Sequence, residues 1–167
     1  FKLSVENDED MFDDTRDSAY YRSEYLEYKK TYDPLVTKFE DAQDDYDEEL
    51  EYVTFLRERL TRLEELIQNP DVSAEVLEEY AQVSTQLSDA EFYLTEKESA
   101  LELARTNRDK YKDETLLSIN NVIAQIDTSI AEREMNFSEE VLAYNTASAK
   151  EQMDSAEAAI DAYQSAK

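Results

Sequence analysis

Apolar residues recur at steps of three and four over most of the chain, and this spacing predicts long amphipathic α-helices. Between the two prolines, Pro34 and Pro70, one such series is interrupted only by Glu49. Its apolar positions are Leu35, Phe39, Ala42, Tyr46, Val53, Leu56, Leu60, Leu63 and Ile67. Steps of three and four kept over this distance are typical of a coiled-coil seam. We therefore predict a helix over residues 34–68.

A second seam begins just after Asn69-Pro70-Asp71-Val72-Ser73, which has the composition of a helix stop, a short loop and a new N-cap at Ser73. The seam lies largely within a predicted helix over residues 73–110 and ends one residue beyond it. Its apolar positions are Val76, Tyr80, Val83, Leu87, Ala90, Leu94, Leu101, Ala104 and Tyr111. A loop this short between two long helices makes them antiparallel.

Folding the chain about this loop sets a register for the hairpin. Leu60 is expected to face Val83, and Lys97, which breaks the second seam, is expected near Tyr46 and Glu49. An acidic interruption of one helix would thus lie beside a basic interruption of the other. The hairpin is the firmest structural prediction that the sequence allows.

A third seam occupies the C-terminal third, where there is no Pro or Gly. We predict a helix over residues 114–165, after a turn in the polar stretch 110–114. The seam positions are Leu116, Ile119, Ile123, Ile126, Ile130 and Phe137. The apolar phase then slips, which indicates either a stutter in a continuous helix or a break near 136–138 with Ser138 as the cap. Continuity is slightly favoured.

The N-terminal part has few aliphatic residues and many tyrosines. Residues 1–7 are expected to form an extended arm, and residues 8–32 a helix that joins the bundle or docks on another chain. Asp33-Pro34 resembles an N-cap followed by Pro at the first helical position. The prediction is an all-α fold: residues 8–167 form one elongated antiparallel helical bundle, most simply of four helices, with coiled-coil seams.

The residues that are absent restrict the chemistry. The 167 residues include no Gly, Cys, His or Trp. Without Gly, tight hairpins and phosphate-binding loops are disfavoured. Without His and Cys there is no imidazole base, thiolate nucleophile, ordinary zinc site or disulfide. Carboxylates, Tyr and Lys remain as acids and bases, but an enzyme is the least favoured class.

The net charge of the chain restricts the classes of molecule that it can bind. Forty-two acidic and seventeen basic side chains give a net charge of −25. Such a chain repels nucleic acid and anionic lipid, and no apolar run approaches the length of a membrane span. We expect no nucleic acid and no membrane insertion. The expected partners are cations, basic proteins, and copies of the chain or paralogous helical chains.

Two acidic clusters are candidate Ca²⁺ sites. Asp41, Asp44, Asp45 and Glu48 are three or four residues apart and therefore share a helix face, where a hard oxygen-seeking cation would relieve their repulsion. The other cluster crowds the start of the chain: Asp8, Glu9, Asp10, Asp13 and Asp14. No EF-hand spacing is present, so binding would be weak and multiple. The alternative is a solvated face that keeps the protein soluble.

Two further features have alternative interpretations. Five of the twelve tyrosines lie between Tyr20 and Tyr32, and they indicate either ordinary helix packing or a lateral contact surface. Basic residues form two islands, which either make internal ion pairs such as Glu58 with Arg62 or set the register between neighbouring rods. The islands are Arg57, Arg59 and Arg62, and Arg105, Arg108, Lys110 and Lys112.

The stretch Asp10-Met11-Phe12-Asp13-Asp14-Thr15-Arg16-Asp17 is an acidic run with an embedded Phe that leads into a polar helix. In this motif, and in its small, acidic, cysteine-free, helical character, the chain resembles the trichocyst matrix (granule lattice) proteins of ciliates. The heptad-rich remainder is consistent with that family without being specific to it. The resemblance implies storage in a secretory granule, packing into a paracrystalline lattice and calcium-triggered expansion. It carries over no catalytic or binding residues.

The leading functional prediction is a structural, non-enzymatic protein that assembles into an ordered lattice or filament and responds to Ca²⁺, in a granule or outside the cell after discharge. Because the first residue is Phe1, we expect a product processed from a longer precursor. The sequon Asn136-Phe137-Ser138 would accept a glycan only in the secretory pathway. The alternatives are the helical hairpin of a bacterial export adaptor or surface protein, and a scaffold from a halophile.

Overall fold

The structure, a computed structural model, describes residues 1–13, 16 and 18–165. Within these residues there are helices and no strands, so the predicted all-α class is confirmed. The helices are α1 (Lys2–Asn7), α2 (Ala19–Ile67) and α3 (Ala74–Ser165). The chain divides into two compact units, Phe1–Leu116 and Leu117–Lys167, which are described separately below.

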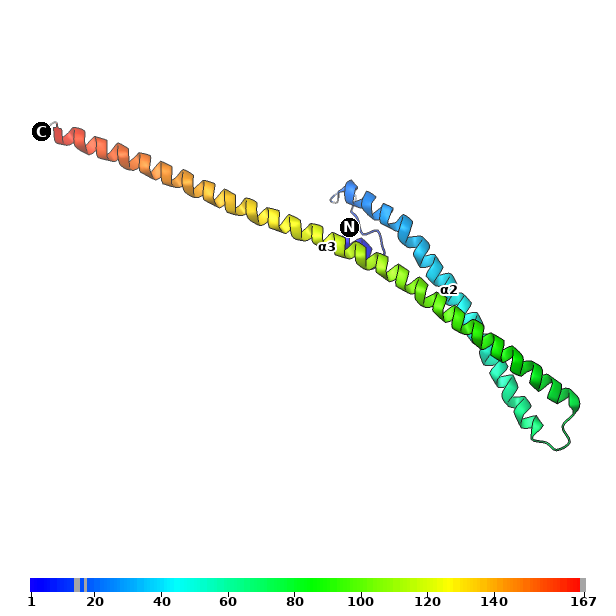
Figure 1. Ribbon diagram of the computed structural model, residues 1–167. Coiled ribbons are helices and arrows are strands. Elements are labelled where there is room, and N and C mark those ends of the chain that lie inside the picture. The colour runs from blue at the N-terminus through cyan, green and yellow to red at the C-terminus, as the bar shows by residue number, and fades with distance from the viewer. Residues whose placement is uncertain (14–15, 17, 166–167) are drawn as a thin grey trace. The chain divides into compact units, whose positions relative to one another are not determined.

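The first unit is built on an antiparallel hairpin of α2 and the first part of α3, which lie side by side (Figure 1). The connection follows from its sequence. Asn69 accepts a hydrogen bond from the Asp71 N–H at 3.1 Å, and α3 begins where the Ser73 hydroxyl accepts the Val76 N–H at 3.4 Å. The predicted N-cap at Ser73 is therefore confirmed, and so is the antiparallel pair that the short loop requires.

The core of the hairpin consists of the seam residues of both helices. Its buried members are Val53, Leu56, Leu63, Val83 and Ala90, with Leu60, Val76, Tyr80, Leu87 and Leu94 packed against them. Leu60 and Val83 thus share one core, as the predicted register requires. The Lys97 ammonium lies 2.5 Å from a carboxylate oxygen of Asp45. Asp45 is the residue next to Tyr46, which was the predicted neighbour of Lys97.

The hairpin differs from the prediction at its N-terminal side. Helices over 8–32 and 34–68 were expected, with Asp33 as a cap between them. Instead, α2 begins at Ala19, where Ser18 is the N-cap, and it continues through Pro34. Proline removes one intrahelical hydrogen bond but does not have to end a helix whose flanking turns are held by packing. Asp33 forms an ion pair with Lys29 at 2.5 Å and caps nothing.

Two other predicted boundaries are wrong. Residues 1–7 are not an extended arm, because they contain α1. The expected turn at 110–114 is absent, so α3 is continuous and there is no separate helix over 114–165. Of the two alternatives for 136–138, continuity is confirmed: the Ser138 hydroxyl donates to the carbonyl of Glu134 at 2.9 Å inside the helix. Over residues 1–13, 16 and 18–165 there are therefore two long helices and one short helix, not a four-helix bundle.

The second unit contains the C-terminal part of α3. Between 117 and 165 every side chain is exposed except those of Ile119 and Ser148, which are half-buried. The third seam is among the exposed groups, with 39 % of Ile123, 49 % of Ile130 and 67 % of Phe137 accessible to solvent. Its apolar pattern was correctly recognised, but this unit does not bury it.

The hairpin core predicts how truncations will affect stability. Leu56 is 1 % exposed and Leu66, on the same helix, is 54 % exposed. Leu56→Ala should lower the free energy of unfolding by about 2–5 kcal/mol because it leaves a cavity in the core. Leu66→Ala should change it by less than about 1 kcal/mol. Urea unfolding followed by circular dichroism measures both, and equal losses would contradict the assigned core.

Candidate functional surfaces

The predicted cation site is an exposed face of α2, called here the acidic face: Asp41, Asp44, Asp45 and Glu48. All four side chains are exposed. Lys97 donates to the carboxylate of Asp45 at 2.5 Å. This hydrogen bond, with the negative field of the neighbouring Glu48 and Glu49, raises the pKa of Lys97.

The acidic face is not a preformed chelating site. Across residues 1–13, 16 and 18–165, no three acidic side chains converge in an arrangement that could hold a metal ion. A straight row of carboxylates along a helix presents its ligands outward, so a cation would have to draw its remaining ligands from water or from another chain. Ca²⁺ binding at these residues stays a prediction.

The other acidic cluster is part of the fold. Asp10 accepts two hydrogen bonds from the guanidinium of Arg22, at 2.9 and 3.1 Å, and another from the Phe12 N–H. The Phe12 N–H, followed by Arg22, lowers the pKa of Asp10. Asp14 of this cluster, together with Thr15 and Asp17 of the family-like motif, lies outside the described residues.

The N-terminal segment, residues 1–12, forms what we call the N-terminal clasp, which packs on α2 and α3 within the first unit. Val5 is fully buried and Ser4 is 1 % exposed. The Ser4 hydroxyl accepts the Met11 N–H at 3.2 Å. Asp8 ends α1 in the left-handed conformation, with φ 57°, which turns the chain back toward α2.

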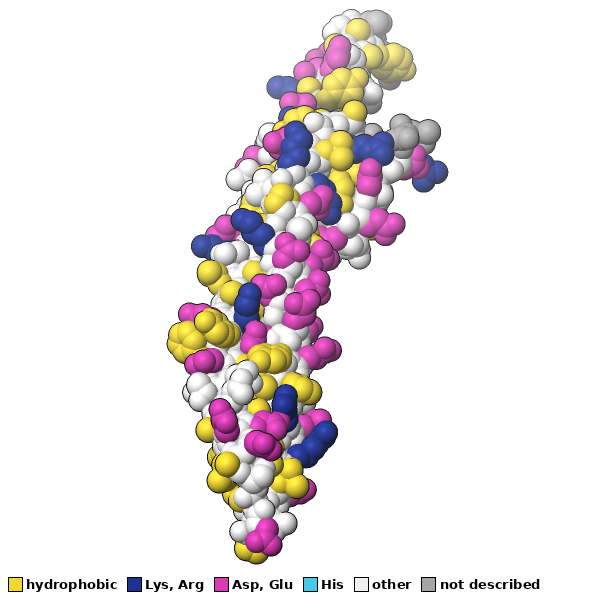
Figure 2. Space-filling view, turned by 90° about the vertical axis from the view of Figure 1, so that its right-hand side faces the viewer, with side chains coloured by type: hydrophobic (Ala, Val, Ile, Leu, Met, Phe, Trp, Pro, Cys, Tyr) yellow, Lys and Arg dark blue, Asp and Glu magenta, His cyan; other side chains and the backbone are white. Residues whose placement is uncertain are grey.

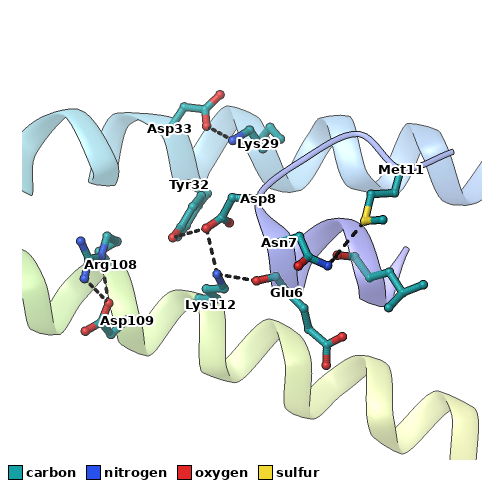
Figure 3. A network of polar contacts seen from close by, with 11 residues as sticks. Glu6, Asn7, Asp8, Met11, Lys29, Tyr32, Asp33, Arg108, Asp109 and Lys112 are labelled. Atoms are coloured by element: carbon teal, nitrogen blue, oxygen red, sulfur yellow. Dashed lines mark hydrogen bonds and ion pairs between the residues drawn. The ribbon is translucent and has the colours of Figure 1, made fainter.

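A small polar network holds the clasp in place (Figure 3). Lys112 of α3 donates to the Asp8 carboxylate at 2.8 Å and to the Glu6 carbonyl at 3.1 Å. The Tyr32 hydroxyl of α2 donates to the same Asp8 oxygen at 3.3 Å. Asp8 is thus the point at which the clasp, α2 and α3 meet.

Beneath the clasp is a stack of aromatic rings. Tyr25, Tyr28 and Tyr32 of α2 are 2–4 % exposed, and Tyr28 stacks on Tyr111 of α3 with 5.6 Å between ring centroids. Phe12 of the clasp lies 6.0 Å from Tyr25. Of the two interpretations of the tyrosine-rich segment, these three residues support helix packing. Tyr20 and Tyr21 remain exposed.

Most residues of the basic islands make ion pairs or ring contacts with other residues of the same chain. Arg57 pairs with Glu91 at 2.7 Å and Arg59 with Glu79 at 2.5 Å, both across the hairpin. The expected pair of Arg62 with Glu58 is present at 3.6 Å. In the second island, the Arg108 guanidinium lies 4.0 Å from the centre of the Phe39 ring. These contacts favour internal pairing over a role between rods.

The exposed C-terminal seam is the surface whose role the sequence did not reveal. We use this name for Ile119, Ile123, Ile126, Ile130, Phe137 and Tyr144. Val122, Ile126, Ile130 and Arg133 line one shallow depression, which places Arg133 on the same side of the helix as the isoleucines. The apolar pattern was visible in the sequence, but such a pattern looks the same whether its partner is in the same chain or in another.

The clasp was also missed, and little in the sequence marks it. Its only signals are Val5 among polar neighbours and an unassigned Lys112 in the second basic island. A six-residue helix is too short to be recognised by periodicity. On the face drawn in Figure 2, acidic side chains are spread along the molecule with basic and hydrophobic side chains among them.

The aromatic stack allows a matched pair of substitutions. The Tyr28 hydroxyl is buried and finds no hydrogen-bond partner among the described residues, whereas the Tyr32 hydroxyl bonds to Asp8. Tyr32→Phe should destabilise the protein by about 1 kcal/mol, and Tyr28→Phe should be neutral or stabilising. Thermal unfolding distinguishes them, and a reversed order would contradict the network in Figure 3.

Alkaline pH should unfold the first unit. Burial, followed by the charge of Asp8, raises the pKa of Tyr32 to about 12, and burial also raises the pKa of Tyr25 and Tyr28. Below about pH 10 these groups are neutral in both states, so their contribution to stability is complete. Above it the unfolded chain ionises first, and stability falls as pH rises toward 12.

The absorbance of tyrosinate measures this titration directly. Tyr25, Tyr28 and Tyr32, whose pKa is raised by burial, should ionise only above about pH 10, together with loss of helical circular dichroism. If all twelve tyrosines titrated in one step near pH 10 with the helical signal unchanged, the buried stack would be contradicted.

Neither the helices nor the sequence relationships identify a known type of protein. Within the described residues, no helix has a stretch that is both apolar and long enough to cross a membrane. Comparison of the chain with protein-family models, with curated proteins and with solved structures finds no match.

Proposed function

We propose that this chain is a structural, non-enzymatic protein that assembles with copies of itself or with paralogous helical chains into an ordered lattice or filament. The observation that carries the proposal is the exposed C-terminal seam. Ile126 and Ile130 are 45 % and 49 % exposed, and Phe137 is 67 % exposed. Full burial of such a side chain from complete exposure contributes about 1.5–3 kcal/mol, so covering the exposed part of each one still favours association with another helix.

Charge is the proposed control of assembly. The net charge of −25 makes neighbouring copies repel, and the acidic face projects carboxylates outward without enclosing a cation. Ca²⁺ bridging such faces would reduce the repulsion between chains without changing the hairpin core. On this mechanism the cation acts between copies, which agrees with the outward row of ligands on α2.

The proposed setting is a secretory granule, with release to the outside on discharge. It rests on the resemblance to trichocyst matrix proteins through residues 10–17, part of which lies outside the described residues. Calcium-dependent reorganisation of a stored lattice is what that family resemblance implies. The acidic composition and the long helices are compatible with it.

The proposal is tested by titrating the chain with Ca²⁺ at fixed ionic strength, with Mg²⁺ as the control ion. Light scattering and sedimentation velocity report mass, and circular dichroism reports helix content. Reversible growth in mass with Ca²⁺ but not Mg²⁺, at constant helix content, is expected. A mass that responds to neither ion would contradict a cation-controlled assembly.

Substitutions on the acidic face test whether these residues bring about the response to Ca²⁺. Replacing Asp41, Asp44 and Asp45 by Asn and Glu48 by Gln should raise the Ca²⁺ concentration needed for assembly several-fold, because the bridging ligands are lost. The control changes the same number of charges elsewhere in the first unit, at Glu64, Glu65, Asp71 and Glu78, which are exposed. An equal shift in both variants would mean that the effect is one of net charge alone.

A second candidate function is an α-helical hairpin that acts as a binding module, cut from an export adaptor or surface protein. The observation in its favour is the antiparallel hairpin of α2 and α3, with its short loop at 68–73. This function predicts that divalent ions leave the mass unchanged. The titration above therefore separates the two candidates.

A further inference from the structure

We propose that the exposed C-terminal seam pairs with the same seam of a second copy, as an antiparallel coiled coil over residues 117–153. This inference rests on the proposed assembly function and names the contact by which it begins. It is carried by two charged residues, Arg133 and Glu140, which interrupt the apolar series.

Two rows of residues keep a seven-residue spacing through the point at which the other apolar residues slip in phase. Leu116, Ile123, Ile130, Phe137 and Tyr144 are seven residues apart and form one row; the other row is Ile119, Ile126, Arg133, Glu140 and Ala147. These are the two core positions of a heptad. The second row is thus apolar except for one basic and one acidic residue.

A parallel pair would bring like charges together. When two identical helices run in the same direction, each core residue faces its own copy. Arg133 would then face Arg133 and Glu140 would face Glu140, in layers that flank Phe137. Because the two residues are about 10 Å apart along one helix, neither could reach its opposite charge on the partner. Like charges facing one another in a core disfavour this arrangement.

An antiparallel pair centred on Met135 removes the conflict. Each residue then faces one that lies as far after Met135 as it lies before it. Ile123 faces Ala147 and Ile126 faces Tyr144.

At the middle of this pair, Arg133 faces Phe137 and lies one turn from Glu140 of the other copy. The guanidinium can therefore rest on the ring while it reaches the carboxylate. The chain already makes the first of these contacts in its other unit, where Arg108 lies over Phe39 at 4.0 Å.

The length of the paired region agrees with the bounds of the second unit. With Met135 at the centre, Leu117 faces residue 153, so the contact begins where the second unit begins. Its length of 37 residues corresponds to about 55 Å of helix. Between Leu116 and Ala131 the only charged residue is Asp127, so this half of the paired region is nearly uncharged, whereas Glu132, Glu134 and Glu139 lie near the centre outside the two core rows.

The first test measures the mass of the full chain by sedimentation equilibrium in EDTA, at an ionic strength of about 0.15 M. A concentration-dependent dimer is expected. Arg133→Glu and Glu140→Arg should each weaken it about tenfold or more, and the double swap should restore it. Glu139→Arg makes the same charge change on a neighbouring residue outside the two core rows and should leave the dimer nearly unchanged. A monomer at all concentrations would overturn the proposal, as would equal weakening by Glu139→Arg and Glu140→Arg.

The second test measures orientation. The chain has no Cys, so single cysteines report contacts cleanly. Under mild oxidation, I123C mixed with A147C should give a disulfide-linked heterodimer, while I123C alone should stay unlinked. Linkage of I123C to itself would show a parallel pair and overturn the antiparallel assignment.

These results are independent of the calcium titration. A dimer in EDTA whose mass does not respond to Ca²⁺ would support the seam contact and contradict the proposed assembly function. Growth with Ca²⁺ from a chain that is monomeric in EDTA would do the reverse.

Discussion

Long amphipathic helices have to cover their apolar stripes, and in this chain the two long helices differ greatly in length. Helix α2 has 49 residues and α3 has 92. The stripe of α2 is matched by the first part of α3, and both are buried in the hairpin core around Leu56 and Val83. The rest of α3 carries an apolar stripe with the same spacing of three and four residues, and this stripe is exposed. Because of this mismatch the first unit has a buried core, whereas the apolar stripe of the second unit is left uncovered by the described residues.

The first unit is stabilised by contacts of the N-terminal clasp as well as by the apolar seam of the hairpin. The N-terminal clasp buries Val5, and hydrogen bonds from Lys112 and Tyr32 join its Asp8 to both long helices. Ion pairs across the hairpin, such as Arg57 with Glu91, add little stability each, because exposed pairs are worth at most about 1 kcal/mol. They do use Arg57, Arg59 and Lys97 in contacts within the unit.

The sequence predicted the parts of the fold that depend on local pattern. The helical class followed from heptad spacing and the absence of Gly, and the hairpin followed from Asn69-Pro70 and the Ser73 cap. Lys97 was placed within one residue of its actual partner, Asp45. Local signals mislead where tertiary contacts outweigh them: Pro34 is typical of a helix start, yet it lies inside α2, whose Tyr28 and Tyr32 just before it are buried.

The sequence could not show which partner covers each stripe. Ile123, Ile126 and Ile130 have the spacing of a core helix, and a fold-back within the chain was the simplest way to bury them. Nothing between 110 and 114 stops the helix, so α3 continues instead. The clasp was invisible for a different reason: it is six helical residues long, and its contacts with Tyr32 and Lys112 join positions that are distant in the sequence.

The most direct test of this account is hydrogen exchange of the backbone amides, measured by mass spectrometry as a function of protein concentration. The account predicts that protection of residues 117–153 rises as copies associate, while the hairpin core around Val53 and Val83 is protected at every concentration. Protection over 117–153 that did not depend on concentration, or a rise confined to the first unit, would contradict it.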